Sequence, residues 1–429
     1  MCKGIDVNAS THHFLMLQGL RSPFFLRLAQ GLRAAGARVT KLHFTLGDHL
    51  YWRGSAQSCH KPEAALAAHY EQLLASGSFT DLVLFGDCRP VHQPAIAQAR
   101  ALGIPVHVFE EGYFRPDWVT LERAGVNGYS DLPRDPNWYR EVQSHVPASE
   151  PTTEVGPAMS ARILHDIAYN AGNLLNPLFY RHYQSHVPHS ILAEYLSYAR
   201  RFVQVRAKRA RDQRGVEQLC ASPAPPFYLV ALQVAGDSQL TVHSRFKSSE
   251  DFLHEVFDSF VGHASRDAWL VIKNHPLDPG LQRHDRLVAR LANEYGCAAR
   301  VVFLDSGNLP QLLDNACGLV TVNSTSIGQA MFHRCPTIAM GSSIFAMPGL
   351  TFDGSLDAFW GAAKQTHARP DAALFRAFSR VVRWATQING GLYTERGIGL
   401  AVQNALPNLL APEGKLQALL RQFPCERES

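Results

Sequence analysis

The sequence predicts an α/β protein with two doubly wound, Rossmann-like domains, and three observations support this class. Short apolar and β-branched runs alternate with segments of helical periodicity, which is typical of a parallel sheet covered by helices. This alternation occurs twice, before residue 138 and after residue 221. The chain has 429 residues, more than a single hydrophobic core organises. We therefore expect two domains of about 200 residues each.

The first half of the chain contains four predicted strands, at residues 12–18, 38–45, 81–85 and 106–109. Apolar residues recur at helical spacing between them, at 23–33, 64–74 and 93–102. In sheets of this kind, ligands bind beyond the carboxyl ends of the strands. Three residues at these ends are therefore candidates for a cleft, namely Gln18, Gly19 and Asp87.

The stretch from Val106 to Trp118 carries the most informative motif. It runs from a strand directly into Glu110, Glu111 and Gly112, and the glycine permits a sharp turn. When adjacent carboxylates are partly shielded from water, their repulsion raises the pKa of one toward the range of a general acid or base. The motif alone fits a structural role equally well, with one glutamate capping the turn and the other solvated. Glu111 lies nearer the turn and is the first candidate to mutate.

Residues 138–221 break the pattern, because no strand is predicted there and helices are expected. Apolar residues between 191 and 203 give a broad helical face, and the arginines lie mostly elsewhere on the helix. The basic residues that we single out are Arg200, Arg201, Arg206, Lys208 and Arg209. A basic amphipathic helix can lie on an anionic membrane surface. A solvated charged face over ordinary core packing is the more common explanation.

The proline-rich segment 222–226 predicts a stiff linker, after which the α/β alternation resumes. Strands are predicted at 227–233, 269–273, 301–304, 318–322 and 336–341, with helices between them. The expected organisation is a Rossmann-like domain at 1–137, a basic helical insert at 138–221, a second Rossmann-like domain at 222–385 and helices at 386–429 that pack back. Two such domains facing each other across a cleft form the GT-B architecture of glycosyltransferases.

Two motifs of the second half suit an anionic ligand. Lys273 ends a predicted strand, and His275 follows it with its backbone restrained by Pro276. A histidine at that place can donate to a phosphate, although a histidine satisfied by a nearby carbonyl is more common. The second motif runs between a strand and a helix and contains Asn323, Ser324, Thr325 and Ser326. Its hydroxyl groups fit helix capping and phosphate binding at once.

A further loop, after the first strand of the second half, contains Gln233 and Asp237. A carboxylate from each domain is an arrangement that glycosyl transfer through a cationic transition state uses. A turn-forming Gly-Asp-Ser segment without a catalytic role is a strong alternative.

Composition excludes several classes of protein. A formal net charge of +4 is too small to indicate nucleic-acid binding, and no phosphate-binding glycine loop of a nucleoside triphosphatase or dinucleotide enzyme is present. The eight cysteines show neither zinc-ligand spacing nor a disulfide framework. The first residues lack the apolar core of a signal peptide, and no apolar run is long enough to span a bilayer. We therefore expect a cytoplasmic protein.

Several motifs in combination resemble the KpsS-type (LipB-type) capsule polysaccharide proteins, from about residue 12 to 345. They are Leu17–Phe25, Phe44–Asp48, Phe85–Pro90, Phe109–Trp118, Asn274–Pro276 and Val322–Ser326. The resemblance implies a retaining β-Kdo transferase that uses CMP-Kdo and lysophosphatidylglycerol to begin the poly-Kdo linker of a capsule. It also implies a peripheral position on the inner face of the inner membrane and other capsule assembly proteins as partners.

The resemblance also implies roles for single residues. Glu111, or Glu110, corresponds to an acid/base residue that bacterial sialyltransferases share, and His275 to a contact with the CMP phosphate. The hydroxyls of residues 324–326 correspond to a CMP-binding motif, and Asp237 is the candidate nucleophile. CMP-linked donors carry one phosphate, so no metal or other cofactor is expected. The alternatives are a sialyltransferase-like enzyme that acts on a glycan and a non-enzymatic component of capsule assembly or export.

Overall fold

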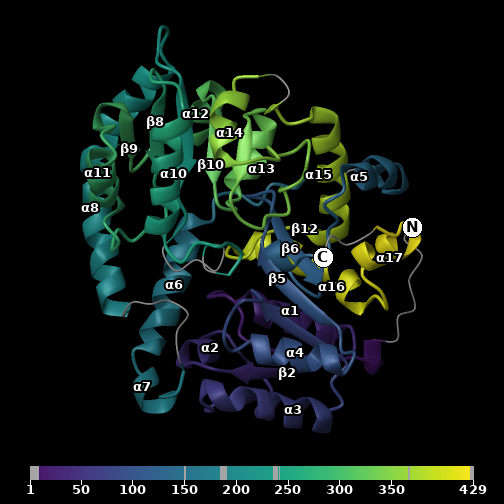
Figure 1. Cartoon of the computed structure of the whole chain (residues 1–429). Helices are drawn as coiled ribbons and strands as arrows, with labels where there is room; N and C mark the ends of the chain where they lie inside the picture. The colour runs from purple at the N-terminus through teal and green to yellow at the C-terminus, as the bar shows by residue number, and fades with distance from the viewer. Residues whose placement is uncertain are drawn as a thin grey trace. The chain divides into compact units, whose positions relative to one another are not determined.

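The structure is a computed structural model, and it describes residues 9–148, 151–183, 191–234, 240, 242–365 and 368–425. Two units make up the chain (Figure 1). Unit 1 consists of residues 1–132, 144–186 and 380–426, and unit 2 consists of residues 133–143, 187–379 and 427–429. The two α/β units confirm the predicted fold class, whereas their facing each other across a cleft stays a prediction.

Unit 1 contains a seven-stranded mixed sheet in the order β12-β6-β5-β4-β1-β2-β3. Its strands are β1 (His13–Met16), β2 (Arg38–His43), β3 (Ala56–Ser58), β4 (Asp81–Phe85), β5 (Val106–Glu111), β6 (Trp118–Arg123) and β12 (Gln387–Asn389). The sequence analysis predicted β1, β2, β4 and β5, which pair in parallel. It did not predict β6 and β12, which extend the sheet with antiparallel pairing.

Helices cover both faces of the unit 1 sheet (Figure 1). On one face, α1 (Phe24–Ala34) and α16 (Glu395–Leu410) pack on Phe14, Met16 and Phe109. On the other face, α3 (Leu66–Ser76) and α4 (Gln93–Ala101) pack on residues such as Leu15 and Val108. This alternation along β1 and β5 is what a strand buried on both faces requires. The unit also contains α2 (Leu46–Leu50), α6 (Met159–Asn173), α7 (Asn176–Phe179) and α17 (Lys415–Gln422).

Unit 2 contains a five-stranded sheet in the order β11-β10-β7-β8-β9, and all of its pairings are parallel. The strands are β7 (Phe227–Ala231), β8 (Trp269–Lys273), β9 (Val301–Leu304), β10 (Gly318–Thr321) and β11 (Thr337–Ala339). The helices are α5 (Pro136–Val142), α8 (Ile191–Cys220), α10 (Ser249–His263), α11 (His284–Glu294), α12 (Leu309–Asn315), α13 (Ser326–Phe332) and α14 (Leu356–Ala362). All five strands had been predicted, because each is a short apolar run.

The helices of the predicted insert fall into both units. Helices α6 and α7 belong to unit 1, and α8 belongs to unit 2 together with the proline-rich segment 222–226. Helix α15 (Ala372–Thr386) contributes its residues up to 379 to unit 2 and the remainder to unit 1. In the described ranges, no helix combines the length and the hydropathy that crossing a membrane requires.

Candidate functional site

Glu110 and Glu111 are the last two residues of β5, at the carboxyl edge of the unit 1 sheet. Gly112 follows, and a Cβ at this position would lie 2.0 Å from the Trp118 carbonyl oxygen, so only glycine allows the chain to return into β6. Successive strand residues point to opposite faces of a sheet. The two carboxylates therefore meet different surroundings although they are adjacent in sequence.

The surroundings of Glu110 compensate its negative charge less than those of Glu111 do. Its Oε1 accepts a hydrogen bond from the Glu111 amide at 2.9 Å. A Cβ on Gly86, whose φ is +71°, would lie 3.3 Å from Glu110 Oε2, so the carboxylate lies close over that backbone. Burial, reinforced by the charge of Glu111, outweighs the amide and the charges of Arg89 and Arg115 and raises the pKa of Glu110 to about 7. A carboxyl group that titrates there suits general acid or base chemistry.

Glu111 is compensated by several partners. Its Oε1 accepts hydrogen bonds from Arg162 Nη1 at 3.1 Å and from the Tyr393 hydroxyl at 2.8 Å, and Arg115 Nε lies 3.9 Å from Oε2. Burial acts to raise the pKa of Glu111, but the two guanidinium groups and the hydroxyl outweigh it and hold the pKa below its usual value. The geometry therefore favours Glu110, rather than Glu111, as the residue that gains and loses a proton near neutral pH.

The other candidates of unit 1 have structural contacts. Gln18 is buried and donates to two tyrosine hydroxyls, while its Oε1 accepts from Arg89 at 3.1 Å. Arg89 also donates to the Gly19 carbonyl at 2.8 Å. Asp87 is buried, and its Oδ2 accepts from the Val126 amide at 2.9 Å. These residues fix the loops around Glu110 and hold Arg89 in place.

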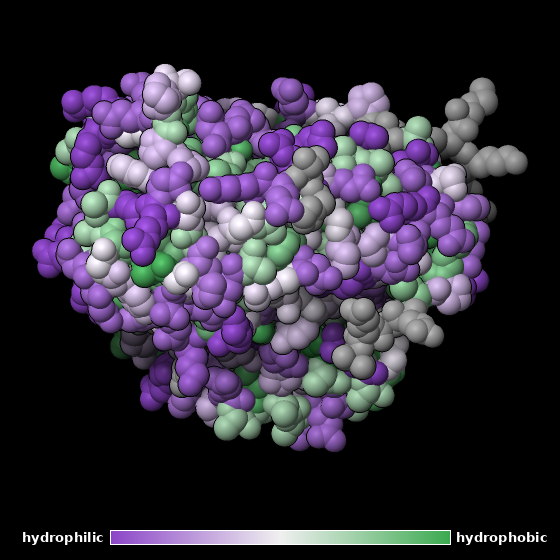
Figure 2. All heavy atoms as spheres, turned by 45° about the horizontal axis from the view of Figure 1, so that its top comes forward, coloured by the Kyte–Doolittle hydropathy of each residue, from purple (hydrophilic) through white to green (hydrophobic). Residues whose placement is uncertain are grey.

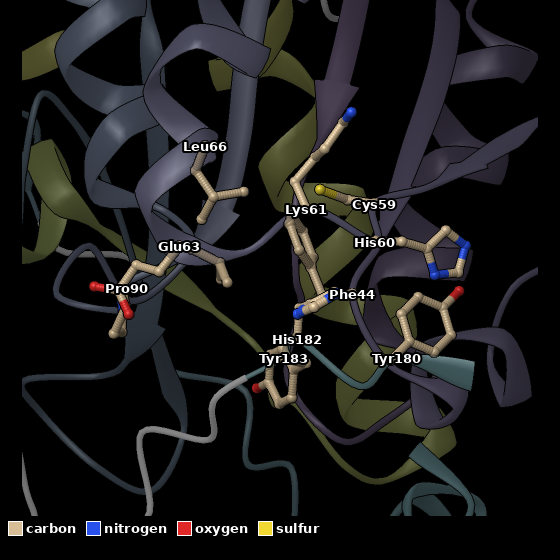
Figure 3. Close-up of a pocket in the computed structure, with 11 residues that line it drawn as sticks. Phe44, Cys59, His60, Lys61, Glu63, Leu66, Pro90, Tyr180, His182 and Tyr183 are labelled. Atoms are coloured by element: carbon tan, nitrogen blue, oxygen red, sulfur yellow. The ribbon is translucent and has the colours of Figure 1, made fainter. Parts of the chain in front are cut away.

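A pocket of unit 1 lies beside the residues that follow β2, β3 and β4 (Figure 3). Its lining includes Phe44, Cys59, Pro90, Tyr180 and Tyr183. It encloses about 20 Å³, room for about one water molecule. It is therefore too small for a sugar or a nucleotide, which need several hundred Å³.

His275 follows β8 at the carboxyl edge of the unit 2 sheet and is half-buried. The Leu277 amide donates to His275 Nδ1 at 3.1 Å, so in the neutral ring the proton is on Nε2. The His275 amide donates to Asn274 Oδ1 at 2.9 Å. The imidazole is thus held in a defined orientation and tautomer. Beside it, Pro276 is exposed and Lys273 is buried.

Helix α8 supports the loop that carries His275. Arg201 Nη1 lies 2.7 Å and Lys208 Nζ 3.0 Å from the buried carboxylate of Asp305, which also accepts from Asn274 Nδ2 at 3.4 Å. Ser197 donates to the Pro279 carbonyl at 2.7 Å. Two of the five basic residues singled out for a membrane are therefore ion-paired inside unit 2. The other three are exposed, namely Arg200, Arg206 and Arg209.

The hydroxyl motif lies after β10 at the same edge. Ser324 Oγ accepts from the Ser326 amide at 3.2 Å, and Gln233 Nε2 donates to Asn323 Oδ1 at 2.6 Å. Ser326 Oγ and Gln233 Oε1 are buried and have no hydrogen-bond partner among the described residues. Because buried polar atoms normally have hydrogen-bond partners, a polar ligand group at this edge would supply partners for these two atoms. Thr325 is half-buried beside them.

The sequence analysis placed Asp237 near this edge, but this residue lies outside the described residues. Conversely, it missed Arg162 and Tyr393, which lie 51 and 282 positions from their partner Glu111 in the chain. No sequence signal marks such distant partners. Arg89 and Arg115 are different, because they lie within motifs that the sequence analysis had already singled out.

The two sheets, each ending in polar residues at its carboxyl edge, define an α/β protein of the kind that binds ligands beyond its strands. The family model described as "Capsule polysaccharide biosynthesis protein" matches residues 80–393. The chain therefore belongs to the family of capsule polysaccharide biosynthesis proteins, which confirms the resemblance described above.

Two relatives match almost the whole chain. The capsule polysaccharide export protein KpsS of Escherichia coli is 33% identical over 398 residues, which are 91% of this chain and 99% of the relative. The capsule polysaccharide modification protein LipB of Neisseria meningitidis serogroup B is 32% identical over 396 residues, 90% of this chain and 93% of the relative. Among solved structures, the β-Kdo 2,7 transferase of Thermosulfurimonas dismutans KpsC is similar with a TM-score of 0.43, at 11% identity, over 92% of this chain and 99% of that one.

Proposed function

We propose that this protein is a retaining glycosyltransferase that moves β-Kdo from CMP-Kdo to lysophosphatidylglycerol and so begins the linker of a capsular polysaccharide. One observation carries the enzymatic part of the proposal, namely the position of the Glu110 carboxyl group at the end of β5, close to the Gly86 backbone, where burial raises its pKa to about 7. Family membership supports the role in capsule biosynthesis, and the motif resemblance supports the donor and the acceptor.

Glu110 is the proposed acid/base residue. Its carboxylate form takes the proton of the acceptor hydroxyl as that oxygen attacks the sugar, and a pKa near the working pH keeps a large fraction of this form available. Glu111 stays ionised against Arg162 and Tyr393. Its fixed negative charge helps to keep the pKa of Glu110 high.

Unit 2 supplies the proposed donor-binding residues. The Nε2–H group of His275 donates a hydrogen bond to the CMP phosphate. This hydrogen bond strengthens as negative charge develops on the departing phosphate. Asn323 and the hydroxyls of Ser324, Thr325 and Ser326 bind the nucleotide. Since CMP-Kdo carries a single phosphate, we propose that transfer proceeds without a divalent metal. Asp237 is the proposed nucleophile that forms a covalent sugar intermediate, which makes the reaction retaining.

The reaction is tested by incubating purified protein with CMP-Kdo and lysophosphatidylglycerol and measuring CMP release and the lipid product. A parallel reaction with CMP-sialic acid separates a Kdo transferase from a sialyltransferase-like enzyme. Absence of product from folded wild-type protein with both donors would contradict the proposal. Capsule production that persists in cells carrying the folded Glu110→Gln variant would indicate a non-enzymatic assembly or export role instead.

The proposed acceptor is a lipid, so we also propose a peripheral position on the inner face of the inner membrane, next to other capsule assembly proteins. Fractionation of cells that produce the protein checks this position. Recovery of the protein with the soluble fraction at low ionic strength would contradict it, because electrostatic attachment is strongest there.

A further inference from the structure

Helices α6 and α7 of unit 1 present an apolar outer face, which we call the α6–α7 face. Eight large apolar side chains of this segment are 48% to 69% exposed, namely Met159, Ile163, Leu164, Ile167, Leu174, Leu175, Leu178 and Phe179. Leu174 and Leu175 lie between the two helices. The charged side chains Arg162 and Asp166 of α6 are 35% and 30% exposed and are ion-paired with Glu111 and Arg21. By contrast, the face drawn in Figure 2 is mostly hydrophilic, with apolar residues in small separate groups. Contiguous exposed apolar side chains mark an interaction surface.

The α6–α7 face belongs to a firmly attached element. The Tyr169 hydroxyl donates to Asp48 Oδ1 at 2.9 Å, and Asn173 Oδ1 accepts from the Gly47 amide at 2.8 Å. Asn176, the first residue of α7, accepts from the Leu46 amide at 2.8 Å. These buried contacts fix the inner side of the two helices on α2. The apolar side chains are therefore held outward by the fold of unit 1 itself.

Basic residues lie beside the end of α7. His60 Nδ1 donates to the Phe179 carbonyl at 3.0 Å, and the His60 ring stacks on Tyr180 at 4.7 Å between centroids (Figure 3). The exposed Lys61 follows His60 in the chain, and the exposed Arg181 follows Tyr180. One exposed carboxylate, Glu63, shares the neighbourhood. An apolar face with a basic margin is the composition of elements that lie in the headgroup region of an anionic bilayer.

The chemistry of the face favours lipid over a protein partner. Protein interfaces are enriched in Tyr, Trp, Phe, Met and Arg and carry hydrogen-bonding groups. Most of the large exposed side chains of the α6–α7 face are instead Ile and Leu, beside one Met and one Phe. Arg162 and Tyr169 of α6 donate to Glu111 and Asp48. Acyl chains offer no hydrogen-bond partners, so a surface of this composition matches them.

We propose that the α6–α7 face docks on an anionic phospholipid bilayer, with its aliphatic side chains in the acyl boundary and Lys61 and Arg181 at the headgroups. The inference differs from the membrane role predicted for the arginines of α8. It does not depend on the proposed reaction, because docking requires neither donor nor acceptor.

The test is co-sedimentation of the full-length protein with vesicles of phosphatidylglycerol and phosphatidylethanolamine. The double variant Leu164→Gln/Leu178→Gln should bind at least tenfold more weakly than wild type. Lys61→Gln/Arg181→Gln should weaken binding up to about thirtyfold and reduce its salt dependence, since each of the two basic residues near such a surface contributes about 1 kcal/mol. Both variants should keep the wild-type circular dichroism spectrum.

The matched control is Leu102→Gln, at the end of α4 in unit 1, whose side chain is 47% exposed, and it should bind like wild type. A second comparison is Phe202→Gln/Val203→Gln on α8, where both side chains are at least 65% exposed. The proposal is overturned if wild type does not bind the vesicles, or if only the α8 variant loses binding. It is also overturned if the α6–α7 variant retains vesicle binding but loses self-association in size-exclusion chromatography, since the face would then join copies of the chain. Transfer to a detergent-solubilised acceptor reports on the proposed reaction separately.

Discussion

The carboxyl edges of the two sheets differ in what their polar residues are paired with. In unit 1, Arg115 and Arg162 stabilise the ionised form of Glu111, while burial and the charge of Glu111 raise the pKa of Glu110 to about 7. In unit 2, the carboxylate of Asp305 pairs with Arg201 and Lys208 of α8, while Ser326 Oγ is buried without a partner among the described residues. One edge therefore holds a proton that can move, and the other holds hydrogen-bonding groups for a ligand. The difference fits the proposed acid/base role of Glu110 in unit 1 and the proposed donor-binding role of the unit 2 residues.

The largest expected effect concerns the two adjacent glutamates. Glu110→Gln should lower kcat roughly 100- to 10,000-fold, because it removes a general base without changing the size of the side chain. Glu111→Gln is the matched control and should retain much more activity, since Glu111 stays ionised. Rates of CMP release check both variants. If Glu111→Gln lost more activity than Glu110→Gln, the acid/base role would belong to Glu111.

The next effect separates donor binding from acid/base chemistry. His275→Ala should lower kcat/KM for the donor roughly 10- to 100-fold, the value of one hydrogen bond to a charged group. His275→Gln should recover part of this loss, because its amide also donates. Steady-state kinetics at varied donor concentration provide the measurement. If His275→Ala left the donor KM and kcat unchanged, His275 would not be a donor-binding residue.

A stability effect tests the role of α8. Arg201→Met should lower the free energy of unfolding by about 1–2 kcal/mol, because it removes one of two cations from the fully buried Asp305 side chain. Arg200→Met, at an exposed neighbouring position, should change it by less than about 0.5 kcal/mol. Urea unfolding measures both. If both substitutions changed the free energy of unfolding equally, the ion pair between Arg201 and Asp305 would not stabilise the protein.

The smallest effect is a shift in pH dependence. Activity should rise with pH through about 7, because the base form of Glu110 appears as its carboxyl group loses a proton. Glu111→Gln removes a neighbouring negative charge, so ionising Glu110 becomes easier and its pKa falls. The acid limb of the kcat profile should therefore move to lower pH, by up to about one unit. A shift to higher pH would contradict the assigned interaction.

Much of the fold could be predicted because most of the parallel strands are short apolar runs flanked by turn residues, whereas the exposed, polar β3 (Ala56–Ser58) carries no such pattern and was missed. Strand β6 was missed because its six residues end in two charged side chains, Glu122 and Arg123, and β12 because three residues carry too little pattern. The motifs after β5, β8 and β10 could be located from their positions after strands. The distinction between Glu110 and Glu111 could not, because it depends on Arg162 and Tyr393, which only the folded chain brings to Glu111.

Helix α6 contacts Glu111 and Asp48 through one side and exposes Ile163, Leu164 and Ile167 on the other. Selection should therefore act on its two sides in different ways during evolution. On the inner side, the identity of Arg162 and Tyr169 matters, because each makes a directed hydrogen bond. On the outer side, only apolar character matters, so related chains should exchange Ile, Leu, Val, Met and Phe there freely. Two separate constraints would therefore apply to different positions of one short helix.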